Sequence, residues 1–283
     1  MKNKVSVFGG KGFVGSEFVR QNNKDMHVHN RTDYVPVSNK ILNFISTVDN
    51  YNIHKDPYLD INTNLNLLVR LLENARGVFG EDVEFNFISS WFVYGKTECP
   101  AREDSCCNPT GFYSITKRAA EQLLISYCET FKMNYRILRL CNVLGKGDKK
   151  ISRKKNAFQY MVQQVALNKN IDYLYRGDFY RDFMDVRDVA RAIKLIITEG
   201  SLNEVYNVGS GNPANINEMV FFAKDMTNSS SEISLMEVPE FHKIVQVKDM
   251  WMDNSKLLSL GFEYKYTIKD TIEDLVGYYR NHA

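Results

Sequence analysis

The amino-terminal segment KVSVFGGKGFVGSEF, residues 4–18, runs from an apolar strand through a glycine cluster into an apolar helix. Its glycines at positions 9, 12 and 15 are three residues apart. A loop whose backbone touches a pyrophosphate carries no bulky side chains, and free N–H groups at the start of the following helix bind the phosphates. The segment therefore predicts a dinucleotide-binding loop rather than an ordinary glycine-rich turn. The residues expected to hold the cofactor there are Gly9, Lys11, Gly12, Phe13, Val14 and Gly15.

Strand-like and helix-like segments alternate along the first half of the chain, a pattern typical of a parallel sheet covered by helices. The predicted strands are Val5–Gly9, Met26–Asn30, Ile41–Thr47, Val83–Ser89 and Tyr135–Val143. The predicted helices are Gly12–Asn22, Ile61–Arg76 and Tyr113–Phe131. In the last helix, apolar residues recur every four positions and predict one apolar face: Ile115, Ala119, Leu123, Tyr127 and Phe131.

The character of the sequence changes after about residue 144, where residues 145–156 are polar and basic and shorter elements follow. We expect an α/β protein in which residues 1–144 form a Rossmann-type, doubly wound dinucleotide-binding domain. Residues 145–283 are expected to form mainly a smaller substrate-binding cap. Apolar segments near 184–211 are expected to return to the main sheet, so the two domains would be interleaved in sequence.

Composition narrows the possible partners. The 283 residues are 44% hydrophobic, enough for a large core, and the net charge of +2 gives no reason to expect nucleic acid or a membrane surface. Residues 2–8 already resemble a strand and no apolar run approaches roughly 18 residues, so we expect neither a signal peptide nor a membrane span. The cysteines are odd in number and follow no metal spacing, which predicts reduced thiols, a cytoplasmic location and no metal site. They are Cys99, Cys106, Cys107, Cys128 and Cys141.

The end of the second predicted strand, HVHNRTD, bears on the type of cofactor. Sites for NAD usually place an acid at this point to bind the adenosine ribose, whereas sites for NADP place basic groups near the 2′-phosphate. Here Asn30 stands at the expected position of the acid, Arg31 follows it, and Lys11 lies in the glycine loop. NADP(H) is therefore favoured over NAD. The alternative is that Asp33 binds a ribose hydroxyl, which a small error in the end of the strand would allow.

The segment YSITK places Tyr113 and Lys117 four residues apart at the start of a long helix, on one face. We expect the lysine ammonium to lower the pKa of the phenol from its usual value of ~10 toward neutrality, which would make it a usable acid or base. The alternative is a half-buried tyrosine near a surface lysine. Ser90 ends a buried strand at the sheet edge where α/β proteins bind ligands, and it could bind a substrate oxygen or only cap the strand.

Together these residues resemble the extended short-chain dehydrogenase/reductase family, the nucleotide-sugar epimerases, dehydratases and ketoreductases. The resemblance covers almost the whole chain in order. It is carried by the glycine loop and by SSWFVYG (89–95), YSITKRAAEQL (113–123), ILRLCNVLGKG (137–147), RDFMDVRDVARAI (181–193), VYNVGSG (205–211) and residues 250–276.

The resemblance implies a role for each matching residue. Tyr113 would be the catalytic acid or base, Lys117 its partner and a ligand of the nicotinamide ribose, and Ser90 the third catalytic residue. Asn64 would lie near the cofactor. The substrate would be bound by Ser90 at a sugar oxygen, by Asn142 near the sugar diphosphate and by Arg181 at the phosphates. Structural roles remain open for three of these residues: a buried hydrogen bond for Asn64 and Asn142, and an ion pair with Asp182 or Asp185 for Arg181.

Departures from the family narrow the reaction. Members that eliminate water carry an acidic pair directly after the catalytic serine or threonine, whereas this chain has Trp91 and Phe92, which are neither acids nor bases at neutral pH. Members that epimerise at C3 and C5 use a cysteine and a histidine. Trp91 takes the expected place of that cysteine, and no histidine lies between His54 and His242. Both reactions are therefore disfavoured.

Two hydride-transfer reactions at sugar C4 remain. We favour an NADPH-dependent 4-ketoreductase of a nucleotide-linked 4-keto sugar over an NAD-dependent nucleotide-sugar 4-epimerase, because the ribose-binding acid is missing. A catalytically silent module that binds NADP(H) is a further alternative, although a pure binding protein would not need Ser90, Tyr113 and Lys117 together. The base, the sugar and the product stereochemistry are left open.

Two surfaces are assigned to partners. A basic run could attract the anionic diphosphate of a nucleotide sugar, or it could be a solvated loop. It comprises Lys146, Lys149, Lys150, Arg153, Lys154 and Lys155. A homodimer is expected from the resemblance, with the helix at 113–131 as a candidate interface, although its apolar face could equally lie against the sheet.

Overall fold

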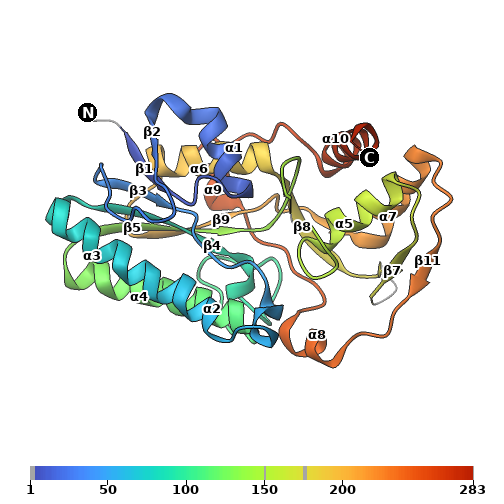
Figure 1. Ribbon diagram of the computed structural model, residues 1–283, viewed down its shortest axis with the longest axis horizontal. Coiled ribbons are helices and arrows are strands. Elements are labelled where there is room, and N and C mark those ends of the chain that lie inside the picture. Colours follow the sequence, from blue (N-terminus) through green and yellow to red (C-terminus); the bar gives the residue numbers. More distant parts are fainter. Residues whose placement is uncertain (1–3, 150, 175–176, 283) are drawn as a thin grey trace.

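A six-stranded parallel sheet forms the centre of the computed structural model, which describes residues 4–149, 151–174 and 177–282 (Figure 1). Its strands are apolar and buried, as expected for a parallel sheet that is covered on both faces. This confirms the predicted α/β fold. In spatial order the strands are β2 (Met26–Val28), β1 (Val5–Phe8), β3 (Lys40–Asn43), β4 (Glu84–Ser90), β5 (Asn134–Leu140) and β9 (Glu204–Val208).

The order of these strands reverses beside β1. The chain first adds β2 on one side of β1, then crosses to the other side and adds β3 and the remaining strands. In open α/β sheets such a reversal leaves a crevice at the carboxyl ends of the two central strands, and ligands bind there. The loops that follow β1 and β3 flank this crevice. They touch at Gly9, whose φ is +76° and whose hypothetical Cβ would lie 2.9 Å from the backbone of Phe44 and Ile45.

Helices cover both faces of the sheet, and each face has its own core (Figure 1). On one face lie α1 (Phe13–Asn22) and α6 (Val186–Glu199), and on the other lie α3 (Leu67–Phe79) and α4 (Phe112–Thr130). Three further helices are only four to six residues long: α2 (Tyr58–Ile61), α8 (Glu240–Val245) and α9 (Ser255–Ser259). No helix in the described ranges is long and apolar enough to cross a membrane.

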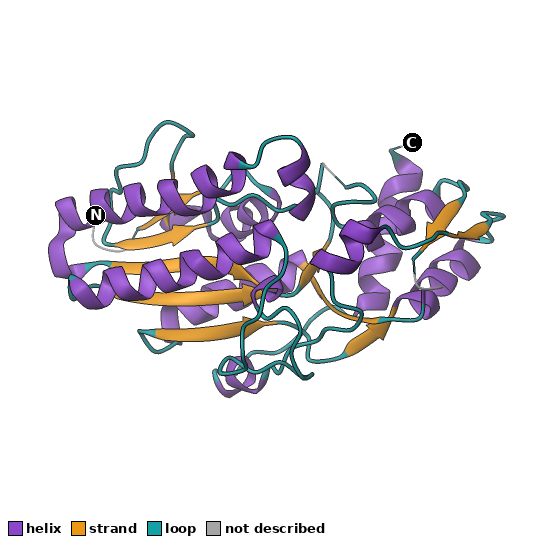
Figure 2. Ribbon diagram, turned by 90° about the horizontal axis from the view of Figure 1, so that it is seen from below, coloured by secondary structure: helices purple, strands orange, loops and turns teal. Residues whose placement is uncertain are grey.

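A second, smaller lobe lies beside the carboxyl end of the sheet and has its own apolar core (Figure 2). It contains two small sheets, of order β10-β8-β6 and β11-β7. Its strands are β6 (Asn142–Leu144), β7 (Ile171–Tyr173), β8 (Tyr180–Asp185), β10 (Pro213–Asn215) and β11 (Ile233–Leu235). Its helices are α5 (Ala157–Ala166), α7 (Ile216–Thr227) and α10 (Ile268–Asn281). Between β8 and β10 the chain returns to the large lobe through α6 and β9.

The predicted strand Tyr135–Val143 is two strands in different sheets. The main sheet ends with a hydrogen bond of 2.9 Å from the Cys141 N–H to the Val208 carbonyl. The next residue, Asn142, already pairs with Phe183 in the second lobe. The local pattern of residues 135–143 gives no signal of such a change of sheet. The crossing places Asn142 at the junction of the two lobes.

Other predicted boundaries shift at the crevice. The strands predicted to end at Asn30 and Thr47 end at Val28 and Asn43, because the chain turns into the crevice loops at these points. The predicted helix Ile61–Arg76 begins earlier and ends later. Its first part contains a π-helical turn, residues 62–66, between α2 and α3.

The apolar face predicted on helix α4 does not lie against the sheet. Its residues Ile115, Leu123 and Phe131 are 47%, 42% and 37% exposed. The buried face is instead formed by residues one or two positions away from this stripe, which include Lys117, Ala120 and Leu124. The exposed stripe is therefore available for another partner.

The packing at the start of α1 leaves no room for a side chain at Gly15, which can be tested by substitution. A Cβ there would lie 2.6 Å from the Gly9 carbonyl oxygen and 2.9 Å from the Gly10 Cα. We expect Gly15→Ala to lower the free energy of unfolding by about 1–3 kcal/mol, the usual cost of overpacking. At Gly77, inside α3, no atom lies within 4 Å of the hypothetical Cβ. Gly77→Ala should therefore raise that free energy by about 0.5–1 kcal/mol. Urea unfolding measures both, and equal effects would contradict the packing argument.

Candidate active site

Tyr113 lies in the first turn of α4, opposite the carboxyl end of β4. Its phenol is hydrogen-bonded to the side chains of Ser90, the last residue of β4, and Ser46, which follows β3. The Ser90 hydroxyl also accepts a hydrogen bond of 3.3 Å from the Phe92 N–H, so it caps the turn after the strand as well. Sequence reasoning missed Ser46, although a polar residue just past a predicted parallel strand is a usable signal.

The ionisation of Tyr113 differs from the prediction. Burial raises the pKa of its phenol to about 12, and the hydrogen bonds with Ser90 and Ser46 offset only part of this effect. The predicted lowering by Lys117 is wrong for this structure, because the amine donates its hydrogen bond to a main-chain carbonyl. The phenol is therefore protonated at neutral pH and is set up to donate a proton.

Lys117 is one turn further along the same face of α4 and is only 1% exposed. Its amine donates a hydrogen bond of 2.7 Å to the Ile88 carbonyl on β4 and lies 4.0 Å from the centre of the Phe87 ring. Burial lowers the pKa of the amine to about 7, and the nearby Glu121 carboxylate opposes this effect. The alternative of a surface lysine is therefore wrong. The charge of Lys117 changes close to neutral pH.

The glycine loop fits a pyrophosphate. Helix α1 begins at Phe13, its N-cap is Gly12, and no side chain caps it, so the first N–H groups of the helix lack partners from its own cap. A Cβ at Gly12 would meet only one atom within 4 Å, the Gly9 carbonyl oxygen at 3.3 Å. The surface above Gly12 is thus open for close approach. Gly9 and Gly15, by contrast, are required by packing within the loop.

The residues expected around the adenosine ribose lie together at the end of β2. The Lys11 amine donates a hydrogen bond of 2.9 Å to the Asn30 side-chain oxygen. Arg31 is exposed and has no side-chain partner among the described residues. Asp33, the alternative ribose ligand, accepts a hydrogen bond of 2.8 Å from buried His29 if that nitrogen carries the proton. The arrangement leaves two cations at this end of the site, whereas the one nearby carboxylate is engaged by His29.

Asn64 makes the buried hydrogen bonds that were considered as its alternative role. Its amide donates to Thr47 at 2.8 Å and to Thr116 at 3.0 Å, and its oxygen accepts from Ser46 at 3.1 Å. These bonds join the loop after β3 to helix α4. Asn64 therefore fixes Ser46 relative to the helix that carries Tyr113, and its amide is fully used within the protein.

A cavity of about 350 Å³ lies between the two lobes, and neither Ser90 nor Tyr113 is among the residues that line it. One wall is formed by Trp91 and Phe92, whose stacked rings have centres 3.9 Å apart. The Phe92 ring meets the Tyr113 ring edge-on at 5.9 Å. The wall thus separates the phenol from the second lobe with two apolar rings, where a pair of acids would be needed to eliminate water.

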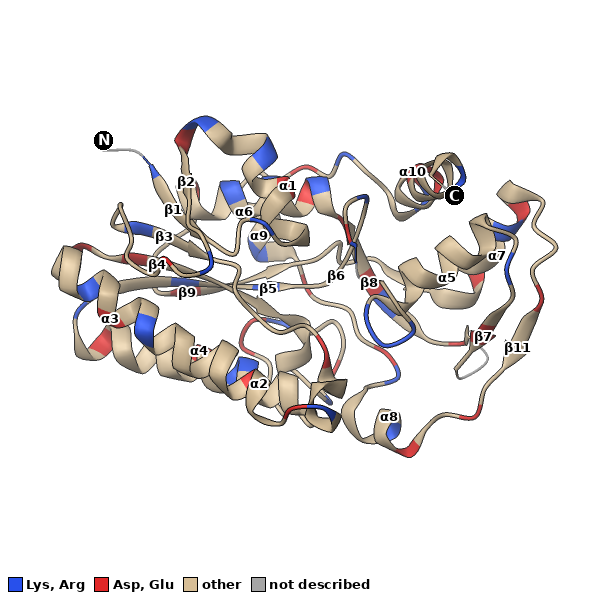
Figure 3. Ribbon diagram, in the orientation of Figure 1, with Lys and Arg blue, Asp and Glu red and all other residues tan. Residues whose placement is uncertain are grey.

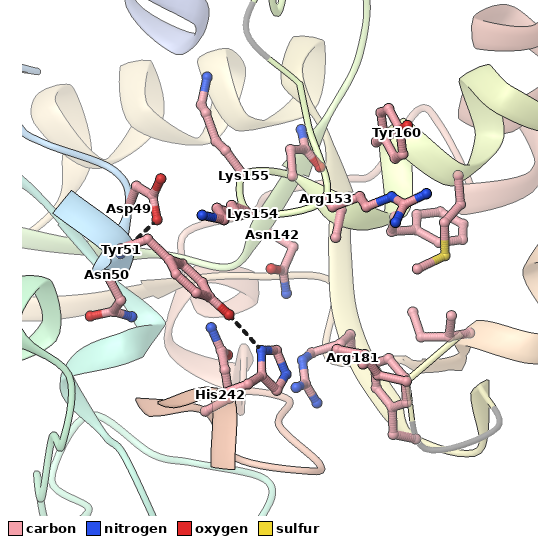
Figure 4. A pocket seen from close by; sticks show the side chains of 18 of the residues that line it. Asp49, Asn50, Tyr51, Asn142, Arg153, Lys154, Lys155, Tyr160, Arg181 and His242 are labelled. Atoms are coloured by element: carbon pink, nitrogen blue, oxygen red, sulfur yellow. Dashed lines mark hydrogen bonds between the residues drawn. The ribbon is translucent and has the colours of Figure 1, made fainter. Parts of the chain in front are cut away.

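Asn142 and Arg181 both line this cavity (Figure 4). The Asn142 amide donates a hydrogen bond of 3.0 Å to the Asp182 carbonyl. The Arg181 guanidinium donates to the carbonyls of Val247 at 2.5 Å and of Lys248. The acids that were considered as its ion-pair partners have other hydrogen bonds: Asp182 accepts from Ser210 and Met252, and Asp185 caps α6 and pairs with Arg187.

The described residues of the basic run lie in the loop between β6 and α5, among the Lys and Arg coloured blue in Figure 3, and form two groups. Arg153, Lys154 and Lys155 line the cavity, where Arg153 pairs with Asp172 at 2.6 Å and Lys155 with Asp148 at 2.8 Å. Lys146 instead faces Asp274 on α10 at 3.5 Å, and Lys149 is exposed. Lys150 lies outside the described residues. Anion binding by the run stays a prediction, and among its described residues these three line the cavity where it would act.

Two cavity residues had no signal in the sequence. The Tyr51 hydroxyl, from the loop after β3, lies 3.2 Å from Nδ1 of His242 on α8 (Figure 4). Burial lowers the pKa of the His242 imidazole, and the charge of Arg181 lowers it further. The pair joins segments 191 residues apart and spans the cavity from one lobe to the other.

Comparison with known families shows which family the chain belongs to. A model described as the NAD dependent epimerase/dehydratase family matches residues 38–209, which is more than half of the chain. The chain belongs to this family. It is therefore an NAD(P)-dependent enzyme with epimerases, dehydratases and reductases of nucleotide sugars among its relatives.

Two relatives illustrate the range of the family. The low-salt glycan biosynthesis protein Agl12 of Haloferax volcanii is 27% identical and is covered over 97% of this chain and 98% of its own. The GDP-6-deoxy-D-mannose reductase of Pseudomonas aeruginosa is 28% identical over 79% of this chain and 74% of its own.

Solved structures show the same fold. The UDP-glucose 4-epimerase of Thermotoga maritima, solved with UDP-glucose, has a TM-score of 0.86 and 21% identity over 99% of both chains. The protein RMD of Pseudomonas aeruginosa, solved with NADPH, has a TM-score of 0.85 and 21% identity over 100% of both chains.

The buried amine of Lys117 predicts a pH-dependent stability. Its pKa is about 7 in the folded protein, against an ordinary lysine value of 10.5, so the unfolded chain binds more protons between these limits. The free energy of unfolding that depends on this group therefore rises with pH across that window, by at most about 1.4 kcal/mol per unit. Lys117→Met should be more stable than the wild type at pH 6, and the gap should narrow by pH 9. A gap that does not change with pH in urea titrations would contradict this result.

Proposed function

We propose that the protein is an NADPH-dependent ketoreductase that reduces the 4-keto group of a nucleotide-linked sugar. The observation that carries this proposal is the protonated, buried phenol of Tyr113, held by Ser90 and Ser46 at the carboxyl edge of the sheet. Reduction of a ketone needs a proton donor at the oxygen, and a phenol with a pKa of about 12 supplies its proton at neutral pH. The wall of Trp91 and Phe92 offers no acid or base for elimination.

Each residue of the proposed site has its own role in this reduction. NADPH, when bound to the glycine loop, supplies the hydride. The Ser90 hydroxyl orients the keto oxygen by a hydrogen bond, and Tyr113 gives that oxygen its proton to complete the alcohol. Lys117, one turn along α4 from Tyr113, would bind the nicotinamide ribose of the cofactor. The apolar rings of Trp91 and Phe92 exclude water from the reacting carbon.

Basic side chains lie where the cofactor and the nucleotide sugar are each proposed to bind. Lys11 and Arg31 favour the 2′-phosphate of NADPH, since Asn30 replaces the acid that would repel it. Asn142, Arg181 and the cavity-lining residues Arg153–Lys155 suit the diphosphate of a nucleotide sugar. The likeness to a reductase of a GDP-linked sugar supports the direction of the reaction.

A second copy of the chain is the partner that we propose for the exposed face of α4. Ile115, Leu123 and Phe131 lie on it, and neighbouring α3 adds Val69 and Val78, which are 39% and 52% exposed. Exposed apolar residues on two neighbouring helices suit a symmetric interface of helix against helix.

Cofactor preference separates the reductase from a 4-epimerase. We expect the purified protein to bind NADPH more tightly than NADH and to retain no NAD. Arg31→Ala should weaken NADPH binding roughly tenfold or more, the usual cost of a lost charge-assisted hydrogen bond, and should leave NADH binding within about twofold. Lys24→Ala, an exposed cation at the other end of β2, is the control. Fluorescence titration measures affinity, and tightly bound NAD identified by mass would favour the epimerase.

Tyr113 provides the test of the chemistry. Tyr113→Phe removes the proton donor and keeps the ring, so kcat for reduction of a nucleotide-linked 4-keto sugar should fall by about 10²–10⁴-fold. NADPH affinity should stay near that of the wild type. Tyr127→Phe, on the same helix and outside the cavity, should retain turnover. Undiminished turnover of Tyr113→Phe at pH 7 would remove the phenol from the mechanism.

A further inference from the structure

A buried histidine holds a half-exposed carboxylate just past the end of β2. Nδ1 of His29 lies 2.8 Å from the Asp33 carboxylate, and the side chains of the two residues are 0% and 47% exposed. The pKa of Asp33 lies below its ordinary value, chiefly because of this hydrogen bond. An ionised carboxylate can only accept hydrogen bonds, so we assign the shared proton to Nδ1 of His29.

Packing fixes the direction of this donor. The His29 N–H donates a hydrogen bond of 2.9 Å to the Val7 carbonyl, which continues the pairing of β2 with β1. The imidazole is stacked on the Phe8 ring, with ring centres 4.2 Å apart and planes inclined by 11°. The His27 ring meets the imidazole edge-on, with centres 4.6 Å apart. Nδ1 therefore has a fixed place beside the end of the strand.

The carboxylate is held in a matching orientation. Its other oxygen accepts a hydrogen bond of 3.3 Å from the Val35 N–H, and the Asp33 N–H donates to the Asn30 carbonyl at 3.2 Å. The segment is then anchored to α3, because the Tyr34 carbonyl accepts a hydrogen bond of 2.9 Å from the Asn74 amide. Each carboxylate oxygen thus faces a donor within the protein, and any other orientation would break the bond with His29.

Filling the space beside Phe8 does not require a histidine. Nε2 of His29 is buried and has no hydrogen-bond partner among the described residues. A buried polar atom without a partner is destabilising, and a phenylalanine would occupy the same place without that cost. The bond to Asp33 is what an apolar ring could not supply. We therefore looked for the use of that bond in the surroundings of the carboxylate.

The same turn carries the cations of the proposed cofactor site. The Lys11 amine, from the glycine loop, donates a hydrogen bond of 2.9 Å to the Asn30 side chain. Arg31 follows directly and is exposed. A carboxylate that is free to turn at this point favours NAD, since it binds a ribose hydroxyl and repels a 2′-phosphate. The orientation of Asp33 therefore bears on the choice of cofactor.

We propose that His29 is a positioning residue that selects NADPH: it holds the Asp33 carboxylate away from the adenosine ribose and leaves the 2′-phosphate to Lys11 and Arg31. This inference rests on the proposed binding of the cofactor at the glycine loop. Because its side chain is fully buried, His29 does not reach the cofactor itself and acts through Asp33.

Cofactor affinity tests this role without any turnover. His29→Phe keeps an aromatic ring on Phe8 and removes the donor, so the Asp33 carboxylate can turn and bind the ribose of NADH. The ratio of the NADH Kd to the NADPH Kd should fall by about tenfold or more, the usual effect of one charge-assisted hydrogen bond. Fluorescence titration measures both constants. A merely structural role would weaken both cofactors equally, and an unchanged ratio would overturn the proposal.

A second substitution shows whether the effect passes through Asp33. Asp33→Asn removes the charge, so adding His29→Phe to this variant should change the ratio by less than about twofold. A tenfold shift that persists in the double variant would contradict the proposed route. His27→Phe, which alters the neighbouring ring and leaves the His29–Asp33 bond in place, is the control and should keep the wild-type ratio.

A matched pair of variants covers the case in which His29→Phe does not fold. Asparagine and leucine have similar shapes, but only the asparagine amide places a donor near the position of Nδ1. His29→Asn should therefore retain the preference for NADPH, whereas His29→Leu should lose it. Equal ratios in these two variants would also overturn the proposal.

Turnover separates this inference from the proposed function. If the wild type prefers NADPH but reduces no 4-keto sugar, the proposed function fails, whereas the Kd ratios still decide the role of His29. If the protein reduces a keto sugar with NADPH and His29→Phe keeps the wild-type ratio, the inference alone fails. A wild type that prefers NADH would overturn both.

Discussion

The burial of the first two turns of α4 against β4 is the constraint on which the site depends. It removes Tyr113 and Lys117 from water, and in a medium of low polarity each charge must be matched by a fixed partner. Burial raises the pKa of the phenol to about 12 and lowers that of the amine to about 7. Both effects favour the neutral forms. The polar groups at the end of β4 and after β3 then decide how far each group can be used as an acid or a base.

The two lobes contribute different parts of the site. The large lobe supplies the glycine loop, the Ser90–Tyr113 contact and the ribose end of β2, all fixed by one sheet. The second lobe supplies Arg181 and the basic loop before α5, and it is joined to the sheet directly through Cys141. The proposed catalytic residues can therefore be the same for many sugars, because they lie on the large lobe. Residues of the second lobe can differ between proteins that recognise different substrates.

The sequence predicts the sheet, the glycine loop and the Ser90–Tyr113–Lys117 group because each rests on local patterns. The α/β fold is confirmed, and Ser90 does meet Tyr113. The features that the sequence did not predict depend on contacts between distant parts of the chain. The ionisation of Tyr113 depends on the depth of burial and on where the Lys117 amine points, and neither follows from a spacing of four residues. The change of sheet at Cys141 and the Tyr51–His242 contact join segments that local periodicity cannot relate.

The apolar stripe on α4 is a second case in which a local pattern does not predict a non-local contact. Its repeat of four residues correctly indicates a helix, but periodicity does not say which face lies against the sheet. The buried face of the helix combines apolar residues, Ala120, Leu124 and Cys128, with several polar ones: Tyr113, Ser114, Thr116, Lys117 and Glu121. An ordinary helix would bury its apolar stripe and leave these groups in water. Because the observed choice costs desolvation of several polar groups, it is stable only where each finds a partner. That requirement explains why Ser89, Arg139, Asn64 and the Ile88 carbonyl converge on one helix.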